Sequence, residues 1–248
     1  MKRETQSSIE ESPLELERFR VRAARAFALT PDDAAGFDRF CAERKCELLV
    51  VRCPTTQMNT VQAFEDGGAR MMDCLVYYQR DLRKNPLSEP DTLDWIRAVV
   101  PSEVPAVATV AATAFEGYFG HYHADERLDR SAADETYRDW AVRSCGDPVF
   151  ADRVYAAWDG DDVVGFATLK RNSPEEGEAV LFGVAPRAQG RGIYNALIVK
   201  ALHWAVEIGA SRCTLSTQIS NVAVQKVWVR NGFEPMISYF TLHKWYGR

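Results

Sequence analysis

The chain alternates between two patterns of apolar and polar residues, one typical of strands and one typical of helices. The apolar runs at residues 47–52 and 71–78 are short and flanked by polar or turn residues, which predicts strands. Over residues 193–205 the apolar positions recur every three or four residues, which predicts an amphipathic helix. Both patterns occur along the whole chain, so we expect an α/β (α+β) protein.

The order of these elements divides the chain into three predicted parts. Residues 1–13 are polar and predict a flexible tail. Residues 14–90 predict a small N-terminal α/β unit that ends in a polar, proline-containing linker over residues 81–90. Residues 91–248 predict a larger unit in the order strand, helix, helix, hairpin, strand, helix, strand, helix, strand.

Local signals refine these boundaries. The alternation around Phe19 favours a strand within residues 14–29, although the alanines there also fit a helix. Ser131, with Asp134 three residues later, resembles a capping box and predicts a helix N-terminus. Residues 159–162 read Asp-Gly-Asp-Asp between two apolar runs, which predicts a hairpin turn.

The most informative stretch is residues 181–200, where a short apolar strand meets a glycine-containing turn and then a helix. Gly190 and Gly192 permit backbone angles that other residues avoid, and they let another molecule approach closely. The turn ends at a helix N-terminus, where free N–H groups favour an anion, and Arg187 and Arg191 add positive charge. We therefore predict a pyrophosphate-binding loop, with an ordinary strand-to-helix turn as the alternative.

Composition and charge exclude several classes of protein. The 248 residues are 46% hydrophobic and 26% charged, which is typical of a globular protein. The net charge of −5 does not indicate a nucleic-acid-binding or membrane-binding surface. No apolar run approaches the ~20 residues of a membrane helix, and the polar N-terminus does not resemble a signal peptide. We therefore expect a cytoplasmic protein.

Cysteine and histidine do not indicate a metal site. The 6 cysteines form no Cys-x-x-Cys pair, and the chain has only 4 histidines, so the sequence predicts no zinc framework. Scattered cysteines without a secretion signal are typical of reduced thiols in the cytoplasm.

The glycine-containing turn belongs to a longer pattern. Residues 187–192 fit Arg/Gln-x-x-Gly-x-Gly/Ala directly after a strand that ends in Pro186, and Asn221 and Gly232 follow at the starts and ends of later elements. Over about residues 92–245 this pattern resembles the GNAT N-acetyltransferase superfamily. The resemblance implies a mixed, mostly antiparallel sheet flanked by helices, with the N-terminal unit as a partial GNAT-like unit. It also implies direct transfer from acetyl-CoA to a primary amine.

A looser resemblance is to the bacterial dTDP-4-amino-4,6-dideoxygalactose (dTDP-fucosamine) N-acetyltransferase type. It rests on Gln218, Asn221 and Lys226, on Tyr137 and Trp140 in one helix, and on the closing strand over residues 238–244. It implies that the acceptor is an amino deoxysugar on a nucleotide carrier.

The superfamily resemblance implies where the cofactor binds. Backbone groups of Phe182 and Val184 would bond pantetheine, and the Val184 N–H would polarise the thioester oxygen. Trp228 occupies the position of a tyrosine that protonates the thiolate in many members, and an indole has no acidic proton for that purpose. Tyr194, Tyr239, Tyr122 or water would then supply the proton. The implied cofactor-binding residues are Phe182, Val184, Arg187, Gln189, Gly190, Arg191, Gly192, Ile193, Asn221 and Trp228.

Four residues are candidates for catalysis. Glu178, six residues before Val184, corresponds to a general base in related enzymes, with a solvated glutamate as an equally weighted alternative. His121 and His123 lie in the loop that covers the acceptor pocket in the superfamily, where histidine can accept a proton or bind a hydroxyl or phosphate. The fourth candidate is Tyr239.

We therefore predict an acetyl-CoA-dependent N-acetyltransferase whose leading acceptor is a nucleotide-linked amino sugar. An amino acid, polyamine or antibiotic amine is the alternative acceptor. A CoA-binding module without transferase activity is the alternative from another class. We expect no nucleic-acid, membrane or metal partner, and we leave open whether the chain forms a homodimer.

Overall fold

The computed structural model describes residues 6–84, 87 and 93–247, so the predicted linker over residues 81–90 lies largely outside the described residues. The helices there are α1 (Pro13–Phe19), α2 (Asp33–Arg44), α3 (Met58–Asp66), α4 (Val104–Ala114), α5 (Arg130–Gly146), α6 (Ile193–Glu207) and α7 (Val222–Arg230). The strands are β1 (Ser8–Ser12), β2 (Ala23–Phe27), β3 (Leu48–Pro54), β4 (Arg70–Asp81), β5 (Ile96–Ala98), β6 (Arg153–Asp159), β7 (Asp162–Ser173), β8 (Glu176–Val184), β9 (Arg212–Gln218) and β10 (Glu234–Trp245).

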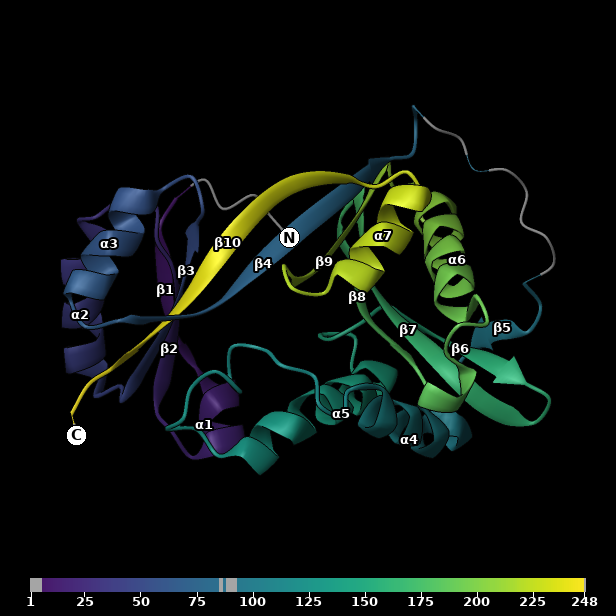
Figure 1. The fold of residues 1–248 in the computed structure, drawn as a ribbon, viewed down its shortest axis with the longest axis horizontal. Helices are drawn as coiled ribbons and strands as arrows, with labels where there is room; N and C mark the ends of the chain where they lie inside the picture. The colour runs from purple at the N-terminus through teal and green to yellow at the C-terminus, as the bar shows by residue number, and fades with distance from the viewer. Residues whose placement is uncertain (1–5, 85–86, 88–92, 248) are drawn as a thin grey trace.

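The strands described here form one open ten-stranded sheet in the order β1-β2-β3-β10-β4-β9-β8-β7-β6-β5. Only the pairs β2–β3 and β8–β9 are parallel, so the predicted mixed, mostly antiparallel sheet is confirmed. The two long strands β4 and β10 lie side by side and cross from one half of the molecule to the other (Figure 1).

Helices cover the sheet on both faces because its strands are apolar on both faces. In the N-terminal half, α2 and α3 lie on one face, where Phe37 and Phe64 pack with Leu49 and Val51 of β3 (Figure 1). In the other half, α6 and α7 cover one face, and α4 and α5 cover the opposite face (Figure 1). The sheet therefore positions loops from both halves around its centre.

Three local predictions need correction. The predicted tail over residues 1–13 is wrong for Ser8–Ser12, because this polar segment pairs with β2 as an edge strand. The predicted strand within residues 14–29 is short, since α1 precedes β2. The N-cap of α5 is Asp129 and not the predicted Ser131. The Asp129 Oδ1 accepts a hydrogen bond from the Ala132 N–H at 2.8 Å, so this free N–H of the first turn already has a partner.

The two predicted units share their sheet. β10 comes from the C-terminal part of the chain, yet it lies between β3 and β4 of the N-terminal part. Tyr239 and Phe240 of β10 oppose Leu75 and Cys74 of β4. The boundary at residue 90 stays a prediction, but the last strand completes the sheet of the first unit.

Candidate active site

The parallel pair β8–β9 opens into a gap. The two strands pair only from Glu176 to Ala179 on β8, and beyond that point β9 diverges. A bulge at Val180 marks the change, because Thr168 and Leu169 on β7 oppose Leu181 and Ala179. The last residues of β8 therefore have a partner on one side only.

The register of β7 and β8 turns two backbone N–H groups toward this gap. The Ala185 N–H bonds the Val164 carbonyl at 2.9 Å, which makes these two residues a hydrogen-bonded pair. Pairs in an antiparallel ladder alternate, so Phe182 and Val184 belong to non-hydrogen-bonded pairs and direct their N–H groups away from β7. The side chain of Gln189 donates to the Val184 carbonyl at 3.2 Å. These two N–H groups can therefore bind an extended ligand in the gap.

The glycine-containing turn lies between the end of β8 and the start of α6. Gly190 and Gly192 have φ values of +76° and +81°, which L side chains rarely adopt. A Cβ atom built on either glycine would meet no heavy atom within 4 Å, so the space in front of the turn is open. The free N–H groups at the start of α6 can donate hydrogen bonds to an anion, so the turn is suited to binding a pyrophosphate.

Two arginines flank this turn, and both are held by the β6–β7 hairpin. Arg191 bonds Asp159 at 2.7 Å, and Arg187 pairs with Asp162 at 3.2 Å. All four side chains are exposed, and exposed ion pairs contribute little free energy. The arginines can therefore exchange these carboxylates for phosphate oxygens.

A cleft of about 520 Å³ lies beside the β8–β9 gap. Phe182, Tyr194, Asn221 and Trp228 line it, whereas the residues of the turn itself do not. On the opposite side the lining comes from the loop before α5, from α5 and from the N-terminal half; it includes Tyr118, His121, Tyr137, Trp140, Arg25, Arg52 and Tyr77. The cleft thus joins the predicted cofactor side to the predicted acceptor loop.

The cofactor side of the cleft holds a linked phenol and indole. The Trp228 Nε1–H donates to the Tyr194 hydroxyl oxygen at 3.0 Å, and the Tyr194 ring packs 5.8 Å from Phe182. Burial raises the pKa of Tyr194, although the bond from Trp228 acts in the opposite direction. Asn221 is the N-cap residue of α7, but its side chain makes no capping hydrogen bond, and its amide donates to Thr217 Oγ1 at 3.1 Å.

Glu178 lines the cleft from β8 just before the bulge. Its carboxylate accepts a hydrogen bond from Asn172 Nδ2 at 2.6 Å, and the same amide donates to Glu176 at 3.0 Å. Glu178 is therefore in reach of a bound molecule, but it already holds a partner.

The predicted histidine loop contacts a third histidine, His243 on β10. His121 Nδ1 lies 2.9 Å from His243 Nε2, and His243 Nδ1 lies 2.7 Å from Asp125 Oδ2. Trp245 Nε1 and the Arg127 N–H also donate to the Asp125 carboxylate. Burial alone would raise the pKa of Asp125, but these hydrogen bonds outweigh burial and hold it below its usual value.

The two other candidates lie elsewhere. His123 Nδ1 accepts a hydrogen bond from the Gly120 N–H at 3.2 Å, and its Nε2 faces Asp134 at 3.2 Å, so it braces the loop and does not line the cleft. Tyr239 is buried on β10 with Phe27 and Tyr77, beside a second hollow of about 370 Å³.

Several polar groups in and near the cleft lack partners within the described chain. Arg52 lines both hollows, and its guanidinium has no hydrogen bond or ion pair with any described residue. Asp73 on β4 and Gln218 on β9 point to the same face of the sheet, and both Asp73 oxygens and Gln218 Oε1 are buried without a described hydrogen-bond partner. These unsatisfied groups include one cation and three acceptor oxygens.

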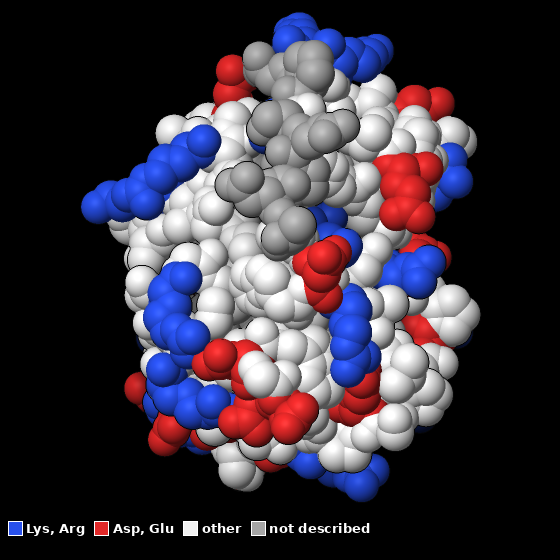
Figure 2. All heavy atoms as spheres, turned by 90° about the vertical axis from the view of Figure 1, so that its right-hand side faces the viewer, with Lys and Arg blue, Asp and Glu red and all other residues white. Residues whose placement is uncertain are grey.

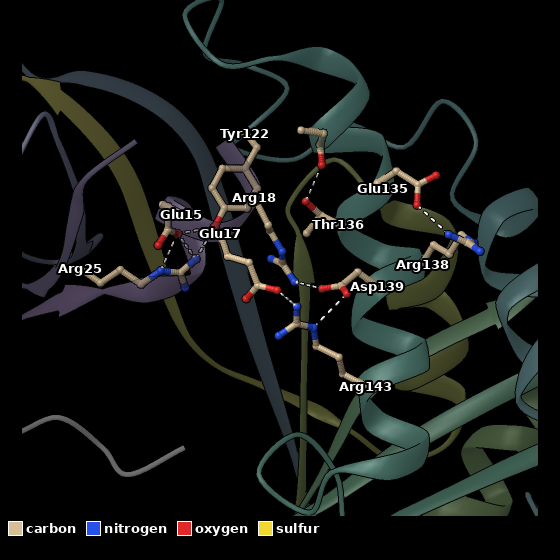
Figure 3. Close-up of polar contacts among 11 residues, drawn as sticks. Glu15, Glu17, Arg18, Arg25, Tyr122, Glu135, Thr136, Arg138, Asp139 and Arg143 are labelled. Atoms are coloured by element: carbon tan, nitrogen blue, oxygen red, sulfur yellow. Dashed lines mark hydrogen bonds and ion pairs between the residues drawn. The ribbon is translucent and has the colours of Figure 1, made fainter. Parts of the chain in front are cut away.

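Ion pairs hold the two halves together beside the cleft (Figure 3). Arg18 of α1 bonds Asp139 of α5 at 3.0 Å, and Arg143 bonds the same carboxylate at 2.9 Å (Figure 3). Glu15 accepts hydrogen bonds from both Arg25 and Tyr122 (Figure 3). These contacts fix the acceptor loop against β2.

The surface charge and the helices of the described residues bear on whether the protein binds nucleic acid, a membrane or a metal ion. Acidic and basic side chains are interspersed on the face shown in Figure 2. Among the residues that the structure describes, no helix is long and apolar enough to cross a bilayer, and no cluster of three potential metal ligands occurs.

Comparison with known proteins identifies the fold. Residues 112–233 match the sequence model of the Acetyltransferase (GNAT) family. A GCN5-related N-acetyltransferase from Sphaerobacter thermophilus superposes with a TM-score of 0.66 at 15% identity, over 96% of this chain and 76% of that chain. One from Kribbella flavida gives a TM-score of 0.61 at 14% identity, over 91% and 82%. The predicted GNAT fold is confirmed, and the match to the family supports acetyl-CoA as the predicted cofactor.

Curated relatives are named mycothiol acetyltransferase. The one from Corynebacterium glutamicum strain R is 30% identical over 91 residues, or 37% of this chain and 31% of that protein. The one from Streptomyces bingchenggensis is 30% identical over 167 residues, or 62% and 51%. The chain thus matches about a third to a half of the length of these relatives. They are not named as dTDP-fucosamine acetyltransferases, so that narrower resemblance stays a prediction.

Proposed function

We propose that this chain, whose residues 112–233 match the GNAT acetyltransferase family, transfers an acetyl group from acetyl-CoA to a primary amine. The observation that carries the proposal is the β8–β9 gap beside the glycine-containing turn, with the Phe182 and Val184 N–H groups directed into it. Acetyl-CoA supplies the activated acetyl group when it is bound. The chain itself orients this group and handles two protons.

Each predicted cofactor-binding residue has a role in this scheme. The N–H groups at the start of α6 and the side chains of Arg187 and Arg191 would hold the pyrophosphate. The Val184 N–H would donate to the oxygen on which negative charge develops. Asn221 and the Tyr194–Trp228 pair line the cleft where the thiol must leave. The Tyr194 hydroxyl is the group that would protonate the leaving sulfur.

The unpaired acceptor oxygens favour an amine as the second substrate. A primary ammonium carries three donors and no acceptor, and Asp73 and Gln218 offer three unsatisfied acceptor atoms. A buried carboxylate without a partner is costly, and a cationic ligand would relieve that cost. These groups support binding of an amine in its charged form, which must then lose a proton before attack.

Arg52 supports an acceptor that also carries an anion. Its guanidinium has no partner among the described residues, and it lies between the cleft and the second hollow. Arginine binds phosphate through two parallel hydrogen bonds. An amino sugar on a nucleotide carrier has both an amine and phosphates, so it remains our leading acceptor. The names of the relatives make mycothiol lacking its acetyl group the principal alternative.

Thiol release from acetyl-CoA tests this proposal. The acceptor panel contains a dTDP-linked amino deoxysugar, mycothiol lacking its acetyl group, an amino acid, spermidine and an aminoglycoside. We expect the nucleotide sugar to give the highest kcat/KM, and we expect Arg52→Gln to raise its KM at least tenfold, the loss of one charge-assisted bond of about 1.5–3 kcal/mol. An unchanged KM would remove the anion assignment.

Calorimetry with CoA separates the transferase from a non-catalytic module. Binding of CoA without thiol release with any amine of the panel would favour a CoA-binding module. Absence of CoA binding to a folded protein would contradict the proposal altogether.

A further inference from the structure

A buried chain of three side chains links two residues of the acceptor loop through one residue of β10. It runs from Asp125 Oδ2 to His243 Nδ1 over 2.7 Å, and from His243 Nε2 to His121 Nδ1 over 2.9 Å. The side chain of His243 is 0% exposed and that of Asp125 is 4% exposed, so water does not compete for these contacts. Only the last member, His121, lines the cleft.

The partners of each atom indicate where the hydrogens lie. Asp125 keeps a low pKa and accepts hydrogen bonds from Trp245 and Arg127, so it is an ionised acceptor. His243 therefore donates from Nδ1, and in this Nδ1–H tautomer its Nε2 is an acceptor. His121 must then donate from Nδ1. Its Nε2 atom, which has no described hydrogen-bond partner, keeps a lone pair.

We propose that Asp125 and His243 fix the tautomer of His121 so that Nε2 takes the proton that the acceptor amine loses. This inference rests on the proposed function. The N–H bond of the ammonium breaks, its proton passes to His121 Nε2, and the freed electron pair attacks the acetyl carbonyl. His121 is then the catalytic residue, and Asp125 and His243 are positioning residues.

The surroundings of His121 keep its ring neutral before the reaction. Burial lowers the pKa of His121 well below its usual value, and neighbouring charges act in the same direction. The positive charge of Arg25 is offset by Glu15, which bonds both Arg25 and Tyr122 (Figure 3). The titratable and charged groups that face the ring are His243, Arg25, Arg52, His123, Tyr122 and, through His243, Asp125.

Glu178 is the competing proton acceptor. Its carboxylate shares the Asn172 amide with Glu176, whereas His121 Nε2 is unengaged within the described chain. His121→Gln is expected to lower kcat/KM by ~10²–10⁴-fold, and Glu178→Gln by less than about tenfold. The reverse order of losses would overturn the proposal.

Long-range proton–nitrogen NMR of histidine-labelled protein reads the tautomers without any ligand. At pH 7 we expect His121 and His243 to carry their hydrogen on Nδ1, and we expect Asp125→Asn to move His121 toward the Nε2–H form. The matched control is His203→Gln, which changes a histidine on α6 outside the cleft. A hydrogen on Nε2 of His121 or of His243 in the wild-type protein would overturn the proposal.

Kinetics of Asp125→Asn, with the best acceptor of the panel, tests positioning. We expect kcat/KM to fall by ~10–10³-fold, which is less than the ~10⁴-fold loss known for an orienting carboxylate in serine proteases. We also expect the acidic limb of the pH–rate profile to shift, while the affinity for CoA stays unchanged. A loss that is independent of pH and equal to the loss of folded protein would mean a structural role. If the wild-type protein acetylates nothing, the proposed function fails, while the NMR measurement still decides the tautomer.

Discussion

At the scale of single residues, the exchange of a tyrosine for Trp228 changes how the thiol can receive its proton. The indole N–H donates to the Tyr194 hydroxyl oxygen, so the phenol keeps its own hydrogen for another acceptor. The same bond would stabilise the phenolate that remains after proton transfer. Two side chains together can thus perform the task that one tyrosine performs in many family members.

Replacing Tyr194 tests this assignment. Tyr194→Phe removes the hydroxyl and keeps the ring against Phe182, so we expect kcat to fall by ~10²–10⁴-fold while CoA affinity stays within about twofold. Steady-state rates and calorimetry measure the two effects.

Trp228→Phe provides the comparison for this substitution. It leaves the phenol in place and removes only its hydrogen-bond donor, so we expect a smaller loss, about tenfold. A Tyr194→Phe protein with a wild-type rate would assign the proton to water.

The sequence located some of the candidate residues and missed others for one reason. His121 and Glu178 line the cleft as expected, because the loop and the strand that carry them can be recognised locally. His243 and Asp125 lie 118 residues apart, and nothing in the spacing predicts that they meet. Their contact requires β10 to lie beside β3, under the acceptor loop.

At the scale of elements, the junction of β8 and α6 is the proposed binding site for the pyrophosphate of CoA. We expect Gly190→Glu to abolish CoA binding, because a carboxylate would occupy the anion position and repel the pyrophosphate. Calorimetry on the folded variant measures this effect.

The matched control is Gly209→Glu. Gly209 has a φ of +77°, close to the +76° of Gly190, and its Cβ position is equally open. Both variants therefore carry the same backbone strain, about 1–2 kcal/mol, and the same added charge. Equal CoA affinity in the two variants would contradict the assignment of the turn.

Most elements could be predicted from hydrophobic periodicity, and the exceptions have physical causes. β1 was missed because the segment that forms it, SIEES, is polar and exposed, and only its backbone pairs with β2. The bulge at Val180 has no sequence signal, since it depends on where β7 shifts register. The gap between β8 and β9, which begins after this bulge, could be predicted only from the resemblance to the GNAT superfamily.

At the scale of the whole molecule, the burial of His121 links stability to pH. Its pKa lies well below 6.5 in the folded protein and near 6.5 in the unfolded chain. Between these values the unfolded chain binds more protons, so the free energy of unfolding rises with pH in that window. The contribution is complete above pH 6.5 and is lost as the pH falls toward the folded pKa.

Urea unfolding between pH 4.5 and 8 measures this effect. We expect a slope of up to about 1.4 kcal/mol per pH unit from this proton below pH 6.5. His121→Gln should flatten that part of the curve. His203 also has a lowered pKa through burial, so His203→Gln should remove a smaller share. A wild-type curve without slope in this window would contradict the buried, neutral state of His121.

The position of β10 in the sheet has a consequence for synthesis. β10 is made after the nine other strands, yet it must enter between β3 and β4. At about 5–20 residues per second, those two strands wait on the order of ten seconds for their shared neighbour. During that time the apolar edge of β3, which is among the most buried segments of the finished protein, is open to other chains. We therefore expect chaperones to raise the yield of folded protein, and we expect this yield to fall with expression rate before the activity of the folded protein does.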